Sequence, residues 1–230
     1  MILVIDTSSQ HAGLLLWDTD KPVAILTWKS EYNLTSELTP GIKYLLDQAN
    51  TNISELIGII ISLGPGTFNT LRIGMSVGKG LSLGAKIPMI GISTLEAEAY
   101  PYAGIGLPIY SFISVGKDQV AWAGFQKLDG QWQKLHSEQI GNPDTIKISP
   151  SKKIFCGEGL LNHASSLSKS SGRNTIFIDY PGLALRLWSL ATLGSENLEN
   201  GLIDDPNTLQ PLYIKNPNIT KPNPPRRIKP

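Results

Sequence analysis

Hydrophobic and polar positions along the first hundred residues of this 230-residue chain alternate between strand-like and helix-like patterns. Apolar runs and period-two alternation predict strands, whereas apolar residues three and four positions apart predict helices. The strands we expect are Ile2–Asp6, Gly13–Trp17, Val23–Lys29, Ile57–Leu63 and Pro88–Ile92. The helices we expect are Ser36–Ala49, capped by Thr35 or Ser36, a long helix after the Gly64 turn to about Ala85, and one opening at Ser93-Thr-Leu-Glu96 with a capping-box spacing.

A second set of strands and helices follows the Pro- and Gly-rich stretch between Pro101 and Pro108. The strands are expected at Ile109–Val115, Val120–Gln126, Gln131–His136, Lys153–Cys156 and Thr175–Ile178, and a helix is expected from Leu183 to about Gly194. The pattern predicts an α/β chain of two domains, 1–103 and 104–214, without an internal repeat obvious by eye. Residues 215–230 hold five prolines and cannot form a helix or a central strand, so we interpret them as an extended tail.

Composition narrows the classes of protein that this chain can be. Twenty basic and nineteen acidic side chains give a net charge of +1, which excludes coating of nucleic acid by bulk charge. The tail, however, carries five basic and no acidic residues. A solubilising tail and an arm that touches RNA phosphate or a partner both fit it. The sequence has no signal-peptide pattern and no apolar run of about 20 residues, so we expect a cytoplasmic protein with no membrane contact.

Metal chemistry and nucleophilic catalysis find little support in the residues. The chain has a single cysteine, Cys156, and three histidines without metal-ligand spacing: His11, His136 and His163. No Gly-x-Ser-x-Gly elbow is present. We therefore expect no metal site and no catalytic residue, and the default for Cys156 is a buried, inert thiol.

Two turns carry the residue types that hold phosphates in other proteins. The turn after the first strand begins Asp6-Thr-Ser-Ser9, and actin-like ATPases hold nucleotide phosphates at an analogous hairpin, usually with a glycine after the acid. The turn Gly64-Pro-Gly-Thr67 leads from a strand into a helix, whose first amides have no partner within the helix. Neither matches a P-loop or a dinucleotide motif. A phosphate-facing role for Asp6, Thr7, Ser8, Gly64, Gly66 and Thr67 and a purely structural turn both stay open.

The helix after the Gly64 turn contains four glycines, each costing about 1 kcal/mol relative to alanine in a helix interior. Leu71, Gly74, Met75, Gly78 and Leu81 fall on one face, whose bare centre lets another backbone approach closely. That backbone could belong to the chain's own sheet, to its helix Ser36–Ala49, or to another subunit.

The start Ile2-Leu-Val-Ile-Asp-Thr-Ser8 and the block from Gly64-Pro-Gly-Thr-Phe-Asn-Thr-Leu-Arg-Ile-Gly74 to Ser93-Thr-Leu-Glu96 resemble the bacterial TsaB (YeaZ) family. The resemblance is strong over residues 1–97 and weaker beyond, where Gly157-Glu-Gly159 and Leu209–Lys215 resemble later landmarks. It implies an actin-like (ASKHA) two-domain fold with mixed sheets flanked by helices. It also implies a non-catalytic paralogue of TsaD that supports the threonylcarbamoylation of adenosine beside the tRNA anticodon.

The resemblance further implies partners and a binding surface. TsaD is the expected heterodimer partner, TsaE a further one, and tRNA a contact made through the complex. Self-association is expected through the same surface. The family's surface helices correspond here to Ser36–Ala49 and Thr67–Leu83, so the expected interface residues are Leu38, Ile42, Leu45, Leu71, Gly74, Met75, Gly78 and Leu81. We expect no cofactor in the chain itself and leave open a nucleotide at the interface of the complex.

The chain departs from the family at two places. Leu34-Thr35 stands where the family often has His-Ser, and Ser114-Val-Gly-Lys117 stands where it has an Asp-Ala-Arg-like strand end. Both changes remove polar residues, which argues against independent catalysis. Two enzyme alternatives remain, an actin-like ATPase and a glycoprotease-type metallopeptidase. The missing glycine after Asp6 speaks against the first, and the missing histidine ligands speak against the second.

Overall fold

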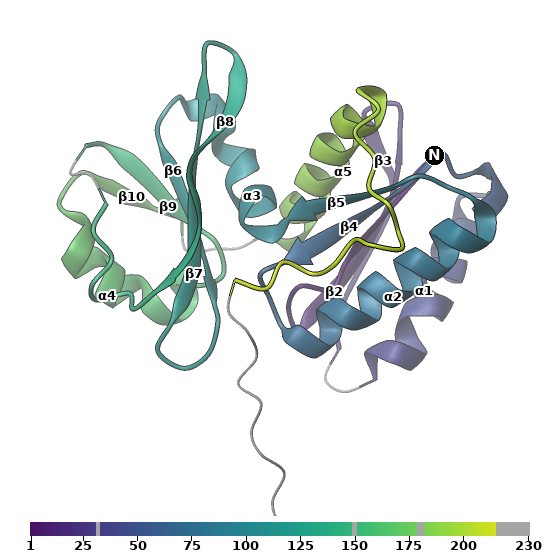
Figure 1. Ribbon diagram of the computed structural model, residues 1–230, viewed down its shortest axis with the longest axis horizontal. Coiled ribbons are helices and arrows are strands. Elements are labelled where there is room, and N and C mark those ends of the chain that lie inside the picture. The colour runs from purple at the N-terminus through teal and green to yellow at the C-terminus, as the bar shows by residue number, and fades with distance from the viewer. Residues whose placement is uncertain (31–32, 149–150, 179–181, 215–230) are drawn as a thin grey trace, which may run out of the picture.

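The computed structural model describes residues 1–30, 33–148, 151–178 and 182–214, so the predicted basic tail lies outside the described residues. Two five-stranded sheets stand next to each other, and helices flank both of them (Figure 1). Within the described residues, none of the helices combines the length and the apolarity needed to cross a membrane.

The first sheet has the strand order β3-β2-β1-β4-β5. β1 pairs antiparallel with β2, which pairs antiparallel with β3, while β4 and β5 add parallel strands on the other side of β1. These strands are β1 (Ile2–Asp6), β2 (His11–Asp18), β3 (Lys21–Lys29), β4 (Gly58–Gly64) and β5 (Met89–Ser93).

Helices cover both faces of this sheet because its central strand is apolar at every position up to Asp6. Leu3 and Ile5 face α1 (Leu34–Gln48) and α2 (Phe68–Ala85). Ile2 and Val4 face α5 (Leu183–Glu199) on the other side. This is the arrangement expected of a continuous apolar strand that is buried on both faces.

The second sheet repeats the topology of the first. Its order is β10-β9-β6-β7-β8, with two antiparallel strands on one side of β6 and two parallel strands on the other. Its strands are β6 (Ile109–Ser114), β7 (Val120–Leu128), β8 (Gln131–Gly141), β9 (Lys153–Cys156) and β10 (Thr175–Phe177), and the helices on its two faces are α3 (Thr94–Ala99) and α4 (Leu160–Ser171). Two mixed sheets of one topology, flanked by helices, form the actin-like α/β fold that the resemblance implied.

The chain crosses twice between the two sheets. The division predicted near residue 104 falls in the short helix η2 (Tyr100–Ile105). α5 belongs to the predicted unit 104–214, yet it packs on the first sheet, because Leu187, Leu190 and Ala191 cover the apolar face that α1 and α2 leave open. The segment after α5 also returns to the first sheet, where the Leu212 amide donates to the Leu63 carbonyl at 2.8 Å.

Helix ends differ from the sequence-based expectation. α1 begins at Leu34 after Asn33, and neither Thr35 nor Ser36 caps it, because the Ser36 hydroxyl donates to the Asn33 carbonyl. Ser93 precedes α3 without a side-chain capping bond. Another short helix, η1 (Ile53–Glu55), follows α1 and was not predicted.

Candidate functional site

The two turns singled out in the sequence meet at the carboxyl ends of β1 and β4. The Thr67 amide donates to the Ser8 carbonyl at 2.8 Å. A Cβ on Gly66 would lie 2.1 Å from the same carbonyl oxygen, so only glycine permits this approach. The structure therefore brings together all six residues that were considered as phosphate-facing.

Four backbone amides of these turns, those of Thr7, Ser8, Gly64 and Thr67, are already paired within the chain. The Thr7 amide donates to Ser62 Oγ at 3.4 Å, the Ser8 amide to Asp6 Oδ1 at 3.0 Å, and the Gly64 amide to Thr94 Oγ1 at 3.1 Å. A phosphate cradle needs such donors to point at the ligand. Here they stabilise the junction of the two turns, which favours the structural interpretation of Asp6, Thr7, Ser8, Gly64, Gly66 and Thr67.

A buried arginine occupies the centre of this junction. Arg186 of α5 is 3% exposed, and its Nε lies 2.6 Å from Asp6 Oδ2. Its Nη1 lies 2.7 Å from Glu98 Oε1 and 3.7 Å from Glu158 Oε2, and its Nη2 donates to Ser9 Oγ at 3.3 Å. The guanidinium thus binds side chains from β1 and the turn after it, from α3 and from the turn after β9. We call the five residues Asp6, Ser9, Glu98, Glu158 and Arg186 the arginine cluster.

The charges of the arginine cluster shift the pKa values of its carboxyl groups in opposite directions. Burial raises the pKa of Asp6, but the attraction of Arg186 and the hydrogen bonds from Ser8 outweigh it and leave the pKa lowered. Burial raises the pKa of Glu98 and of Glu158, and Arg186 offsets this only in part. The nearby acids hold the Arg186 pKa above its ordinary value despite burial. Asp6 is therefore the main counter-ion of Arg186.

Three members of the arginine cluster, Arg186, Glu98 and Glu158, were not singled out as functional from the sequence. One signal was available for Arg186, which lies four residues before Leu190 and therefore on the apolar face of α5. A charged residue on a buried helical face needs a buried partner. The sequence offers Asp6 as a charged end to a fully apolar strand, but it does not indicate that α5 covers this strand.

The predicted partner face of α1 and α2 points into the protein. Leu38, Ile42 and Leu45 of α1, with Leu71 and Met75 of α2, are buried beside the first sheet. A Cβ on Gly74 would lie 2.1 Å from Thr7 Oγ1, and one on Gly78 would lie 3.0 Å from Ile61. The groups that these two glycines admit are therefore side chains of the chain's own first sheet and of the turn after β1. This corrects the partner-surface assignment for six of the eight predicted residues, whereas Ile42 and the half-buried Leu81 also line a groove on the outer side of these helices.

A groove runs along the outer side of the same two helices. It has a volume of about 710 Å³ between α1, α2 and η1. Ile42, Leu46, Ile53, Val77 and Leu81 supply apolar walls, and Gly80 presents bare backbone with no heavy atom within 4 Å of an added Cβ. We call it the outer groove. Lys43 and Asp47, which pair at 2.7 Å, lie at its edge.

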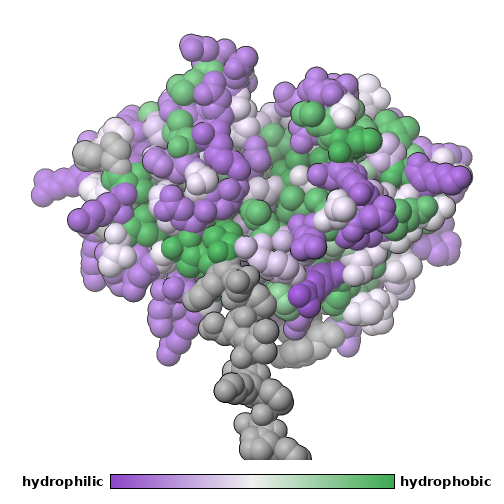
Figure 2. All heavy atoms as spheres, in the orientation of Figure 1, coloured by the Kyte–Doolittle hydropathy of each residue, from purple (hydrophilic) through white to green (hydrophobic). Residues whose placement is uncertain are grey.

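A second cavity, of about 510 Å³, lies between the two sheets near the tip of the β7–β8 hairpin. Figure 2 shows it as a notch between the hairpin and the end of α5. Its walls include Glu96 and Tyr100 of α3, Trp132 of β8 and Glu196 of α5. Trp132 Nε1 donates to Glu96 Oε1 at 3.1 Å.

The part of the chain that the structure describes contains neither a candidate metal site nor an exposed thiol. There, no three His, Cys, Asp or Glu residues lie in an arrangement that could hold a metal ion. Cys156 is fully buried, and burial raises the pKa of its thiol well above the ordinary value. The burial expected of a thiol in an apolar strand is confirmed.

The family model of TsaD, tRNA N6-adenosine threonylcarbamoyltransferase, matches residues 29–178. Proteins named tRNA threonylcarbamoyladenosine biosynthesis protein TsaB match as well, at 28% identity over 153 residues in Escherichia coli and 30% over 141 residues in Bacillus subtilis. The chain belongs to the TsaB branch of this family. These matches cover 63% and 60% of the chain, and they span only 64% and 60% of the two relatives.

The match to another TsaB protein, from Haemophilus influenzae, is longer but weaker, at 22% identity over 94% of the chain and 93% of that relative. Among solved structures, YeaZ from Pseudomonas aeruginosa superposes with a TM-score of 0.77 at 22% identity, over 92% of this chain and 98% of YeaZ. A second structure, described as an uncharacterized protein with similarity to peptidase YEAZ, gives a TM-score of 0.79 at 20% identity, over 93% of this chain and 99% of that one. Both structures support the TsaB fold.

Proposed function

We propose that this TsaB-family chain is an accessory, non-catalytic subunit of the machinery that forms threonylcarbamoyladenosine beside the tRNA anticodon. Its role is to bind and support the TsaD transferase, with TsaE as a further partner. The observation that carries the proposal is its membership in a family whose TsaB members are named for this biosynthesis and whose model is that of the transferase.

The state of the two turns supports a non-catalytic role. In this fold, phosphates would be held by amides at the ends of β1 and β4, and the amides of Thr7, Ser8 and Gly64 donate to the chain itself. Arg186 also neutralises Asp6, the acid that an ATPase would use there. An independent nucleotide site would require these bonds to break. A nucleotide bound at the interface with TsaD is compatible with this arrangement.

The outer groove is the surface that we assign to TsaD. Its walls are apolar, and such grooves on a protein surface mark sites of protein association. It also lies on the two helices that the family resemblance indicates, although on their outer rather than their inner side. A second copy of the chain would use the same groove, so homodimer and heterodimer would exclude each other.

A reconstituted tRNA modification assay tests the role. We expect modification by TsaD and its other components to fall sharply when this chain is omitted and to return when it is added. Equal modification without the chain would contradict the accessory role. A calorimetric titration of the chain alone with ATP and Mg²⁺ tests the ATPase alternative, and we expect no binding at micromolar concentrations.

A matched pair of glycine variants tests the surface. Gly80 and Gly84 are both exposed helical glycines whose added side chain would meet nothing within 4 Å, but only Gly80 lines the outer groove. Gly80→Leu should therefore fill the groove and weaken TsaD binding at least tenfold, about 1.4 kcal/mol. Gly84→Leu should leave the affinity unchanged. Equal affinities in a pull-down titration of both variants would remove this surface from the proposal.

A further inference from the structure

The arginine cluster connects parts of the protein that belong to different sheets. Arg186 is fixed to the first sheet, because α5 lies so close to it that a Cβ on Gly13 would be 2.8 Å from Leu187, and Gly194 contacts Ile60 as closely. Asp6 and Ser9, which also bind the guanidinium, belong to the first sheet as well. This half of the cluster cannot move relative to β1 without disrupting the core.

The other half of the cluster is fixed to the second sheet. Glu158 lies in a turn between Gly157 and Gly159, and a Cβ on either glycine would come within 3 Å of the Phe112 backbone in β6. The turn is therefore held against β6 by a close backbone approach. Glu98 lies on α3, which packs between the two sheets: Leu95 and Ala99 belong to the core of the second sheet and Ala97 to the core of the first. Glu158 thus moves with the second sheet, and Glu98 lies on the helix between the two sheets.

The geometry of the guanidinium restricts the positions that its partners can occupy. Its donors leave a rigid plane at fixed angles, so Nε, Nη1 and Nη2 are satisfied together only when Asp6, Glu98 and Ser9 occupy particular positions. Every one of these residues is less than a tenth exposed, and an unpaired charge at such depth is costly. Rotating one sheet against the other would separate Glu158 from its cation.

We propose that Arg186 is an interdomain clamp that holds the two sheets of the protein at one fixed angle without a bound ligand. At the junction of the two turns, the connection between the sheets is made by protein side chains and needs no bound ligand. It makes the chain a rigid body whose outer groove keeps one orientation relative to the second sheet. The clamp goes beyond the role in tRNA modification, because it is a property of the chain alone and does not depend on the identity of the partner.

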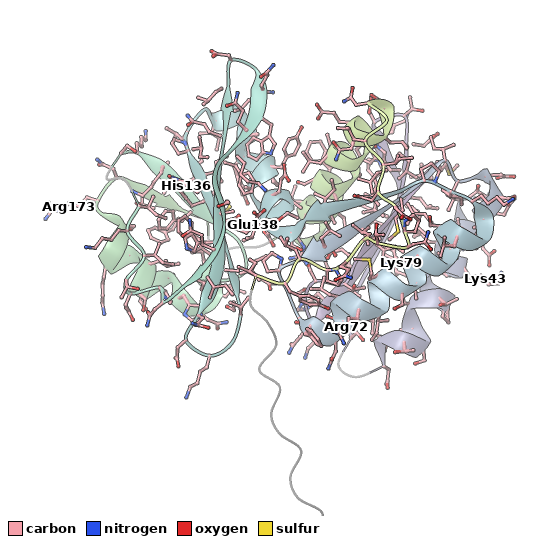
Figure 3. The ribbon with its side chains drawn as sticks, viewed as in Figure 1. Lys43, Arg72, Lys79, His136, Glu138 and Arg173 are labelled. Atoms are coloured by element: carbon pink, nitrogen blue, oxygen red, sulfur yellow. The ribbon has the colours of Figure 1, made fainter. Side chains whose placement is uncertain are left out.

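Distance measurement between two spin labels tests the clamp. Lys43→Cys on α1 and Arg173→Cys after α4 place labels at opposite ends of the molecule (Figure 3). The native Cys156 is fully buried and will not compete for the label. The doubly labelled chain is diluted with unlabelled chain, so that only distances within one molecule are recorded. We expect a single narrow distance distribution in the unmodified background.

Two variants should broaden that distribution. Arg186→Gln removes the cation from both halves of the cluster. Glu158→Lys places an ammonium beside the guanidinium. The Glu158 side chain is 26% exposed, so the fold should tolerate this substitution. This variant keeps the test available if Arg186→Gln does not fold. Glu138→Lys is the matched control, because it makes the same substitution in the Lys134–Glu138 pair, which lies within β8 alone.

The outcomes separate the clamp from other roles. A broadened distribution in Glu158→Lys, with the narrow one kept in Glu138→Lys, supports the clamp. A distribution in Glu158→Lys as narrow as in the control would overturn it, as would a folded Arg186→Gln with an unchanged distribution. Because TsaD is absent from the experiment, a failure here leaves the accessory role standing, and a failure of the modification assay leaves the clamp standing.

Discussion

Glu96 is one of three carboxyl groups, with Glu98 and Glu158, whose raised pKa makes the stability of this protein depend on pH. It lines the cavity between the two sheets and accepts a hydrogen bond from Trp132. Burial raises its pKa above the ordinary value of 4.5, and the attraction of Lys134 and the Trp132 hydrogen bond offset only part of this. The folded chain therefore keeps the Glu96 proton to a higher pH than the unfolded chain does.

The sign of the pH effect follows from this difference in proton binding. Above about pH 4.5 the unfolded chain loses the proton first, so the free energy of unfolding should fall as the pH rises through the folded pKa of Glu96. Asp6, whose pKa is lowered, acts below its ordinary value of 3.8 and so outside this window. Glu96→Gln should keep an acceptor for Trp132 and make the fall shallower.

Urea unfolding at a series of pH values measures this prediction. Glu37→Gln is the comparison variant, because Glu37 accepts a hydrogen bond from the Trp28 indole at 2.9 Å but lies on α1, away from the cavity. A pH profile of Glu96→Gln that overlays the unmodified profile would contradict the role of burial at Glu96.

The glycines of α2 illustrate what a sequence can and cannot decide at the scale of residues. The spacing of Gly74 and Gly78 correctly indicated a face that lies close to another part of a protein. It could not indicate which part, since Thr7 of the same chain and a helix of another chain demand the same absence of a side chain. Gly80 lies off this face in the sequence pattern, and in the structure it is exposed and lines the outer groove.

At the scale of elements, the predicted strands and most of the helices are present, and the main omission is α4. Its sequence from Leu160 to Ser171 contains five serines, which favour caps and turns over helix interiors. Packing decides the conformation here, because Leu160 and Leu167 are buried beside Phe112 and Phe155 of the second sheet. Two apolar residues seven positions apart were too weak a periodic signal to outweigh the serines.

The segment after α5 is an element without regular structure that ties the end of the described chain to α2. The Arg72 guanidinium lies 3.8 Å from the centre of the Phe68 ring, and its Nε donates to the Tyr213 hydroxyl at 2.9 Å. The rings of Phe68 and Tyr213 are 5.3 Å apart. The arginine thus binds both aromatic side chains, one from each segment.

Replacement of Tyr213 should loosen this segment locally and leave the sheets intact. Tyr213→Ala removes the aromatic pair and the contact with Arg72, which together contribute roughly 1–2 kcal/mol. Hydrogen exchange at the Leu212 amide, which donates to Leu63, should accelerate accordingly. Tyr213→Phe keeps the ring and should have the smaller effect. Exchange at Leu212 that is equally slow in both variants would show that the aromatic contacts do not hold the segment.

At the scale of the whole molecule, the two sheets have one topology although the two halves show no obvious repeat in sequence. The common feature is the order of apolar strands and their pairing, which many sequences satisfy, rather than the identity of residues. Topology of this kind depends on which strands become neighbours, and local patterns do not contain that information. The family resemblance supplied it, because the motif residues between 64 and 96 belong to a known fold.

The outer groove makes one further prediction about assembly. If a second copy and TsaD occupy the same groove, a homodimer must dissociate before TsaD binds, and the apparent affinity for TsaD must fall as the concentration of the chain rises. In sedimentation velocity experiments, titration with TsaD should convert homodimer into a one-to-one complex without a species that contains two copies of the chain and one TsaD. Gly80→Leu should weaken both assemblies and Gly84→Leu neither, because only the first side chain enters the groove. A stable two-to-one species would place the second copy and TsaD on different surfaces, and the groove could then serve only one of them.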